Sequence, residues 1–222
     1  MKQLLFSSLF ISLLIGMLAM PTFAQKYELY PYAGGSFLGN FRAFTEQVQS
    51  SSFFNPGLFG IKGGVWTSHE FQIEGNFGYM NQFRIDNFQQ PSIHSFQYEA
   101  LATYNFSQIG KIFPYVTAGA GGLTLSVNNN EDPQNPNQVT YGVLVTPFSS
   151  GGPIPNTIRT FTVNNGDTFF TFSYGGGVKL QRLIGPVGLR FELNGRTIPN
   201  YYGGSVQSWE PKGGILLSWG ER

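Results

Sequence analysis

The stretch Glu70–Tyr79 reads Glu-Phe-Gln-Ile-Glu-Gly-Asn-Phe-Gly-Tyr, in which polar and apolar side chains alternate. Because successive side chains of a β-strand point to opposite faces, this period predicts a strand with one polar and one apolar face. The pattern returns in Val187–Arg196 and in most other extended segments, and nearly every charged residue falls on the polar face. A sheet that is apolar outside and charged inside is typical of a β-barrel that spans a membrane.

Eight segments carry this pattern, and the connections between them alternate between long and short. They are predicted at about 26–38, 57–66, 70–79, 94–106, 113–127, 168–180, 187–196 and 209–219. Short turns on one side and long loops on the other are typical of outer-membrane barrels. We therefore expect an all-β fold, a closed antiparallel up-and-down transmembrane β-barrel of eight strands. The alternative is ten strands, if 139–148 and 157–163 enter the wall instead of forming a hairpin above the membrane.

Three local features refine this prediction. The parity of the fifth strand fails near Gly121–Gly122, which predicts a β-bulge. Residues Ile198–Ser208 are expected to form the last outer loop. Aromatic residues near the predicted strand ends are expected in girdles at the two membrane interfaces, although Trp66 has the parity of the lumen. They are Phe37, Trp66, Tyr79, Phe106, Phe113, Tyr201, Tyr202, Trp209 and Trp219.

The amino terminus has the form of a secretory signal peptide. Lys2 precedes the apolar stretch Leu4–Met20, and Thr22-Phe23-Ala24 supplies small residues at the two positions that a signal peptidase reads. Cleavage is expected between Ala24 and Gln25, so that residues 1–24 are the signal and residues 25–222 the barrel domain. The alternative is a retained transmembrane anchor, for which the apolar stretch is short.

Composition narrows the class of protein. The net charge of +1 creates no field that would attract nucleic acid, and the absence of cysteine removes disulfides and thiolate metal sites. Only 11% of the residues are charged whereas 16% are aromatic, which is natural when half of each strand faces lipid. The alternative is a soluble ligand-carrying barrel, in which the apolar face would lie inside and the charged face outside. The charges on one face, the glycine-rich strands and the aromatic strand ends favour the membrane.

Ten charged residues project into the lumen by parity. They are Glu28, Lys62, Glu74, Glu99, Lys179, Arg190, Glu192, Arg196, Glu210 and Lys212. The interior of an eight-stranded barrel is just wide enough for side chains to fill it, and an unpaired ion there is costly. We therefore expect salt bridges that occlude the lumen. The alternative is a gated ion conduit in which these pairs rearrange.

Three motifs carry a resemblance to a known family. They are Phe-Pro-Tyr-Val-Thr-Ala-Gly-Ala-Gly-Gly at Phe113–Gly122, Tyr-Gly-Gly-Gly-Val-Lys at Tyr174–Lys179 and Gly-Pro-Val-Gly-Leu-Arg-Phe-Glu at Gly185–Glu192. Through their order and spacing the chain resembles the small outer-membrane β-barrel proteins, the OmpA-like and opacity-type group. The resemblance implies the bacterial outer membrane as the location, and outer-membrane lipid, lipopolysaccharide and the barrel-assembly machinery as partners. Such barrels usually finish on an aromatic residue, whereas here Gly220-Glu221-Arg222 follow Trp219.

Three roles are open to such a barrel. The first is structural or surface-interactive, with the loop 128–167 as the longest surface for an extracellular ligand. The second is a small porin-like channel for ions or small solutes. The third is a lipid-modifying enzyme, but His69 has no nucleophile nearby, and His94 adjoins Ser95 on the opposite face of its strand. We expect the first role, with no catalytic residue, no cofactor and no metal site.

Overall fold

The computed structural model describes residues 26–43, 46–47, 57–83, 92–128, 135–145 and 157–220, so the predicted cleavage site at Ala24 and Gln25 lies outside the described residues. Its strands are β1 Tyr27–Gly35, β2 Phe37–Ala43, β3 Glu46–Gln47, β4 Gly57–Trp66, β5 Phe71–Phe83, β6 Ser92–Asn105, β7 Ile112–Asn128, β8 Gln138–Val145, β9 Thr157–Asn164, β10 Thr168–Ile184, β11 Val187–Tyr201 and β12 Gly204–Trp219. Within the described ranges, no helix is long and apolar enough to cross a membrane.

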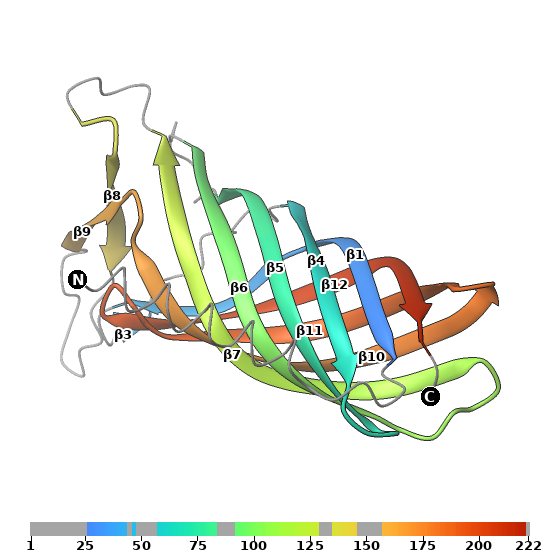
Figure 1. The fold of residues 1–222 in the computed structure, drawn as a ribbon. Helices are drawn as coiled ribbons and strands as arrows, with labels where there is room; N and C mark the ends of the chain where they lie inside the picture. Colours follow the sequence, from blue (N-terminus) through green and yellow to red (C-terminus); the bar gives the residue numbers. More distant parts are fainter. Residues whose placement is uncertain are drawn as a thin grey trace.

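Eight of these strands close into an antiparallel barrel (Figure 1). They follow the order β1-β4-β5-β6-β7-β10-β11-β12, and β12 pairs back with β1, where Leu29 lies opposite Leu217. The short strand β2 continues the pairing with β12 beyond the end of β1, and β3 pairs only with β2. The predicted closed, eight-stranded, up-and-down barrel is therefore confirmed.

The strands β8 and β9 form a separate two-stranded sheet beside one end of the barrel (Figure 1). Because they do not enter the wall, the ten-strand alternative is wrong, and these two segments form the hairpin that was its counterpart. The base of this hairpin is held by the barrel. Val163 is buried, the amide of Val127 donates to Asn165 Oδ1 at 3.2 Å, and the amide of Leu125 donates to the Asp167 carbonyl at 2.8 Å.

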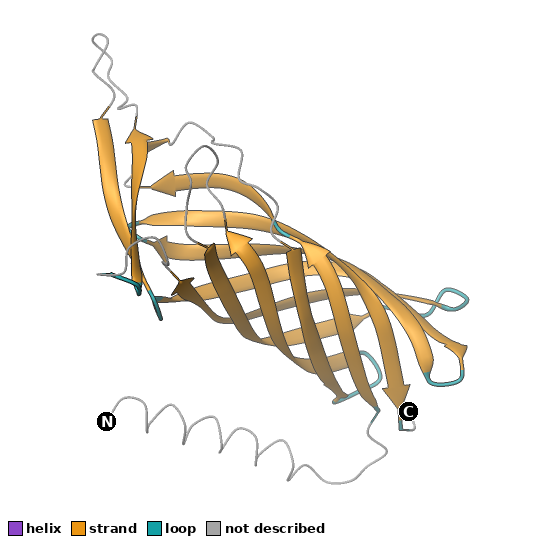
Figure 2. Cartoon of the chain, turned by 90° about the horizontal axis from the view of Figure 1, so that it is seen from above, coloured by secondary structure: helices purple, strands orange, loops and turns teal. Residues whose placement is uncertain are grey.

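Three of the turns between barrel strands lie at the end of the barrel that is opposite to this hairpin (Figure 2). They comprise residues 67–70, 106–111 and 185–186, and the C-terminal end of β12 lies with them. The expected outer loop Ile198–Ser208 is wrong, because β11 continues to Tyr201 and β12 begins at Gly204. Tyr202 and Gly203 have φ angles of 47° and 84°, and positive φ at both central residues allows a two-residue hairpin turn that matches the twist of the strands.

The two faces of the wall are chemically opposite. Glu74 and Arg190 on the inner face are each buried, while Phe77 and Phe191 on the outer face are 52% and 49% exposed. An exposed apolar face of this kind continues around the barrel, which is the arrangement of a membrane barrel and the reverse of a soluble carrier.

Aromatic rings lie near both ends of the outer face. Tyr27 stacks on Trp219 at one end, and Tyr174 packs edge-on against Trp209 toward the other, each pair with ring centroids 6.3 Å apart. Three members of the predicted girdles do not belong to it, because their strand parity turns them inward and they are buried: Trp66, Phe113 and Tyr201.

The predicted bulge at Gly121–Gly122 is wrong. Gly121 lies opposite Glu99, Gly122 lies opposite Tyr98, and β7 keeps an unbroken register with both neighbouring strands. The in–out parity therefore continues to the end of β7, which turns Leu123 and Leu125 into the lumen, where both are buried. The sequence pattern breaks because apolar side chains occupy lumen positions here, and not because the backbone is irregular.

Gly121 is a position of close approach between β7 and β6. A Cβ atom there would lie 2.0 Å from the Tyr98 carbonyl oxygen and 2.7 Å from the Glu99 Cα. We expect Gly121→Ala to lower the free energy of unfolding by about 1–3 kcal/mol, because the backbone must shift. The matched control is Gly75→Ala, where a Cβ meets nothing within 4 Å. Urea unfolding of both variants in lipid vesicles measures the difference, and equal stabilities would contradict this packing.

Candidate functional site

The lumen contains two clusters of ion pairs. The lower cluster lies nearer the short turns and consists of Lys26, Glu28, Lys62, Glu74, Lys179, Arg190 and Glu192. Lys179 Nζ lies 2.8 Å from Glu28 Oε2 and 4.0 Å from Glu74 Oε1. Arg190 connects Glu74 to Glu192, whose Oε2 lies 3.0 Å from Nη2. The members thus form one continuous chain of alternating charges.

The central pair of the lower cluster crosses the whole lumen. Arg190 on β11 and Glu74 on β5 stand four strands apart in either direction around the ring of eight. Both terminal nitrogens of Arg190 donate to the Glu74 carboxylate, with Nη2 3.0 Å from Oε2. Lys62 on β4 reaches Glu192 on β11 at 2.7 Å in a similar way. Paired side chains therefore occupy the centre of the barrel at this level.

Tyrosine and glutamine side chains complete the lower cluster. The Tyr115 hydroxyl donates to Glu192 Oε2 at 2.8 Å and accepts a hydrogen bond from Arg190 Nε at 2.8 Å. The Arg190 guanidinium also lies over the Tyr115 ring, 4.5 Å from its centroid. Gln72 donates to Glu28 at 3.1 Å and accepts from Lys179 at 2.6 Å. Strand parity places Tyr115 and Gln72 inside, so a search for inward hydrogen-bonding groups would have found them.

The upper cluster lies toward the hairpin end and consists of Glu99, Arg196, Glu210 and Lys212. Arg196 pairs with Glu99, and its Nε lies 2.7 Å from Glu210 Oε1. Lys212 Nζ lies 2.8 Å from Glu210 Oε2, and Gln97 accepts from Arg196 Nη2 at 2.7 Å. Two cations and two carboxylates balance here, whereas the lower cluster has four cations and three carboxylates.

All ten charged residues that parity placed in the lumen lie there, and each belongs to one of the two clusters. The least buried is Glu99, which is 8% exposed. Lys26, which precedes β1 and was not among the ten, is also buried, with Nζ 3.3 Å from Glu28 Oε1. Lys26 is two residues before Glu28 and four before Tyr30, so the strand period of two places it on the same lumen face.

The histidines lie away from these clusters. His69 is exposed in the β4–β5 turn, and His94 faces outward, where its Nδ1 lies 2.8 Å from the Tyr79 hydroxyl. Ser95 is buried on the lumen side of the same strand, so His94 and Ser95 are not brought together. In the part of the chain that the structure describes, no group of histidine, aspartate and glutamate is placed to hold a metal ion.

Tyr115 offers a test of the network that leaves every charge in place. We expect Tyr115→Phe to lower the free energy of unfolding by about 1–3 kcal/mol, because Arg190 and Glu192 each lose a buried hydrogen-bond partner. Tyr104→Phe on the outer face is the control. Denaturant unfolding measures both variants, and an unchanged stability of Tyr115→Phe would show that the network does not depend on this hydroxyl.

Comparisons with known proteins agree with this architecture. The family model described as the outer membrane protein beta-barrel domain matches residues 10–196. Among solved structures, Neisserial surface protein A is similar with a TM-score of 0.56 at 12% identity, over 86% of this chain and 96% of that one. The outer membrane protein OprG from Pseudomonas aeruginosa has a TM-score of 0.53 at 9% identity, over 88% of this chain and 96% of that one. No curated protein matches the chain in sequence.

Proposed function

The chain belongs to the outer membrane protein β-barrel family. On this premise we propose that it is a barrel that does not conduct ions. Its closed lumen would make it a rigid scaffold with a structural role or an interaction role at the cell surface. Its location is the bacterial outer membrane, as for the barrels that it is similar to. The observation that carries the proposal is the buried pair of Arg190 and Glu74, which joins opposite walls of the barrel.

Occlusion follows from the energetics of this pair and its neighbours. A permeating ion would have to displace Arg190 from Glu74 and Glu192, and each freed charge would remain in a narrow space with little water. The upper cluster repeats this obstacle, because Arg196 is held by Glu99, Glu210 and Gln97 together. A solute therefore meets two successive layers of paired charges.

A barrel that is made rigid by paired charges in its lumen would hold the segments at its ends in fixed positions for recognition. The β8–β9 hairpin projects at the end of the barrel that lies opposite the short turns (Figure 2), and its base is hydrogen-bonded to β7. Recognition residues tend to lie on loops that a rigid scaffold positions. The proposed extracellular ligand of the 128–167 segment would bind there, while catalysis has no part in this proposal.

Surface display can be tested by introducing one cysteine at a time, because the sequence contains no cysteine of its own. We expect Thr140→Cys in β8 to react with a membrane-impermeant maleimide on intact cells, because Thr140 is exposed on the outer hairpin. His69→Cys, in the exposed β4–β5 turn at the opposite end, is expected to react only after the outer membrane is permeabilised. Labelling of His69→Cys but not Thr140→Cys on intact cells would overturn the proposed orientation.

A further inference from the structure

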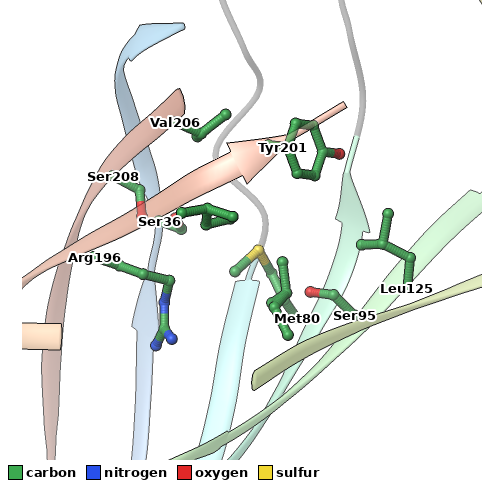
Figure 3. A pocket seen from close by; sticks show the side chains of 10 residues that line it. Ser36, Met80, Ser95, Leu125, Arg196, Tyr201, Val206 and Ser208 are labelled. Carbon is green, nitrogen blue, oxygen red and sulfur yellow. The ribbon is translucent and has the colours of Figure 1, made fainter. Parts of the chain in front are cut away.

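A cavity lies in the lumen between the upper cluster and the outer end of the barrel (Figure 3). It has a volume of about 30 Å³, and its apolar walls are formed by Met80, Leu123, Leu125, Ile198, Tyr201 and Val206. These residues come from β5, β7, β11 and β12, so the apolar lining surrounds the space and is not confined to one strand.

An apolar lining is unexpected at this place. The interior of a membrane barrel is normally polar, and although single apolar side chains such as Leu58, Leu101 and Leu216 also face inward, six of them meet around this cavity. Leu123 and Leu125 make no contribution to the ion-pair clusters, and they break the alternation that predicted the rest of the fold. Their inward position gives the outer end of the lumen a chemistry that differs from the charged layers below it.

The polar groups at the cavity indicate an uncharged ligand. The Arg196 guanidinium is directed away from the cavity (Figure 3) and is already held by Glu99, Glu210 and Gln97. Because the two cations and two carboxylates of the upper cluster balance one another, they offer no net charge to a ligand. The other polar groups of the lining residues are the hydroxyl groups of Ser36, Ser95, Ser208 and Tyr201.

We propose that this outer apolar cavity binds the alkyl end of a small uncharged molecule that carries one hydroxyl group. The volume of about 30 Å³ accommodates the terminal methyl group of an alkyl chain. Met80 is unbranched and has several rotatable bonds, so its side chain is able to move and enlarge the space. A serine hydroxyl at the cavity would bond to the ligand oxygen. The site lies outside the charged layers, so binding does not depend on whether the lumen conducts.

Met80 provides a reporter inside the cavity. The sequence has four methionines, and Met1, Met17 and Met20 all precede the expected cleavage site. Protein labelled with ¹³C-methyl methionine, exported and reconstituted in lipid nanodiscs, would be titrated with 1-butanol, and Met80→Leu assigns the Met80 resonance. We expect a saturable shift of this resonance as the alcohol fills the cavity beside the Met80 methyl group.

Two phenylalanine variants separate binding from partitioning into lipid. Val206→Phe fills the cavity and is expected to weaken the apparent affinity at least tenfold, with Ile198→Phe as the second filling variant if the first does not fold. Val116→Phe, on the half-exposed outer face of β7, is expected to leave the titration unchanged. A shift that never saturates, or that persists equally in the filled variant, would overturn the proposal.

The hydroxyl groups have a test of their own. We expect Ser95→Ala to weaken the binding of 1-butanol several-fold, while the binding of a hydrocarbon of the same length stays unchanged. Ser95 lines the cavity, and its replacement with alanine removes one hydroxyl oxygen and leaves the rest of the side chain in place. An equal loss for both probes would show that the serine acts on packing, which would contradict recognition of the ligand oxygen.

Discussion

Replacing Arg190 with alanine is expected to lower the free energy of unfolding by about 3–5 kcal/mol, the cost of breaking a buried ion pair. The variant leaves Glu74 with Lys179 Nζ at 4.0 Å as its nearest cation, and deprives the Tyr115 hydroxyl of a donor. Because the lumen admits little water, the remaining carboxylates cannot recover this loss by hydration. Denaturant unfolding in lipid vesicles measures the change.

The matched control is Lys111→Ala, which removes one positive charge from the exposed β6–β7 turn and should change stability by less than about 0.5 kcal/mol. A double-mutant cycle with Glu74→Gln isolates the pair, because the double variant leaves neither charge unpaired. We expect the double variant to be more stable than the sum of the single changes predicts. Strict additivity would contradict direct pairing across the lumen.

Arg196→Ala, which removes the central cation of the upper cluster, is expected to cause the second large loss of stability. The cluster would change from balanced to a net charge of −1, with Glu99 left to Asn76 and Ser173 and Glu210 left to Lys212. We expect a loss of about 3–5 kcal/mol and, when Arg190→Ala also opens the lower cluster, a leak that favours cations, because the freed carboxylates face the lumen. Ion-selectivity measurements on proteoliposomes check the second part.

Arg196→Lys separates geometry from charge. A lysine restores the cation but lacks the fork of donors through which Arg196 reaches Glu99, Glu210 and Gln97 at once. We expect an intermediate stability and no cation preference. If Arg196→Ala were as stable as the parent, and if adding it to Arg190→Ala caused no further leak, the upper cluster would have no role in closing the lumen.

Much of this architecture follows from local pattern. The alternation in Glu70–Tyr79 and Val187–Arg196 predicts both the strands and which of their faces is charged, because the side-chain period of a strand is two. Eight such segments with alternating connection lengths then predict a closed barrel. The alternation is repeated in every strand of the wall, so an error in the predicted end of one strand does not change the predicted barrel.

The ion-pair partner of each charged residue does not follow from local pattern, because it depends on the stagger between strands in the closed barrel. Arg190 and Glu74 are 116 positions apart, and nothing in their local sequences relates them. In β7, the inward side chains of Leu123 and Leu125 produce the same loss of alternation that a bulge would produce. In Ile198–Ser208, β-prone and turn-prone residues are mixed, and the two-residue turn at Tyr202 and Gly203 depends on positive φ angles that composition does not specify.

Single-channel conductance in a planar lipid bilayer tests the closed lumen most directly. We expect no discrete current steps from the correctly folded barrel over an extended recording, and steps from the double variant Arg190→Ala/Arg196→Ala, which opens both clusters, under the same conditions. Reproducible steps of uniform size from the unaltered protein would contradict this expectation. They would mean that the paired charges leave a path, and that the barrel works as a small channel.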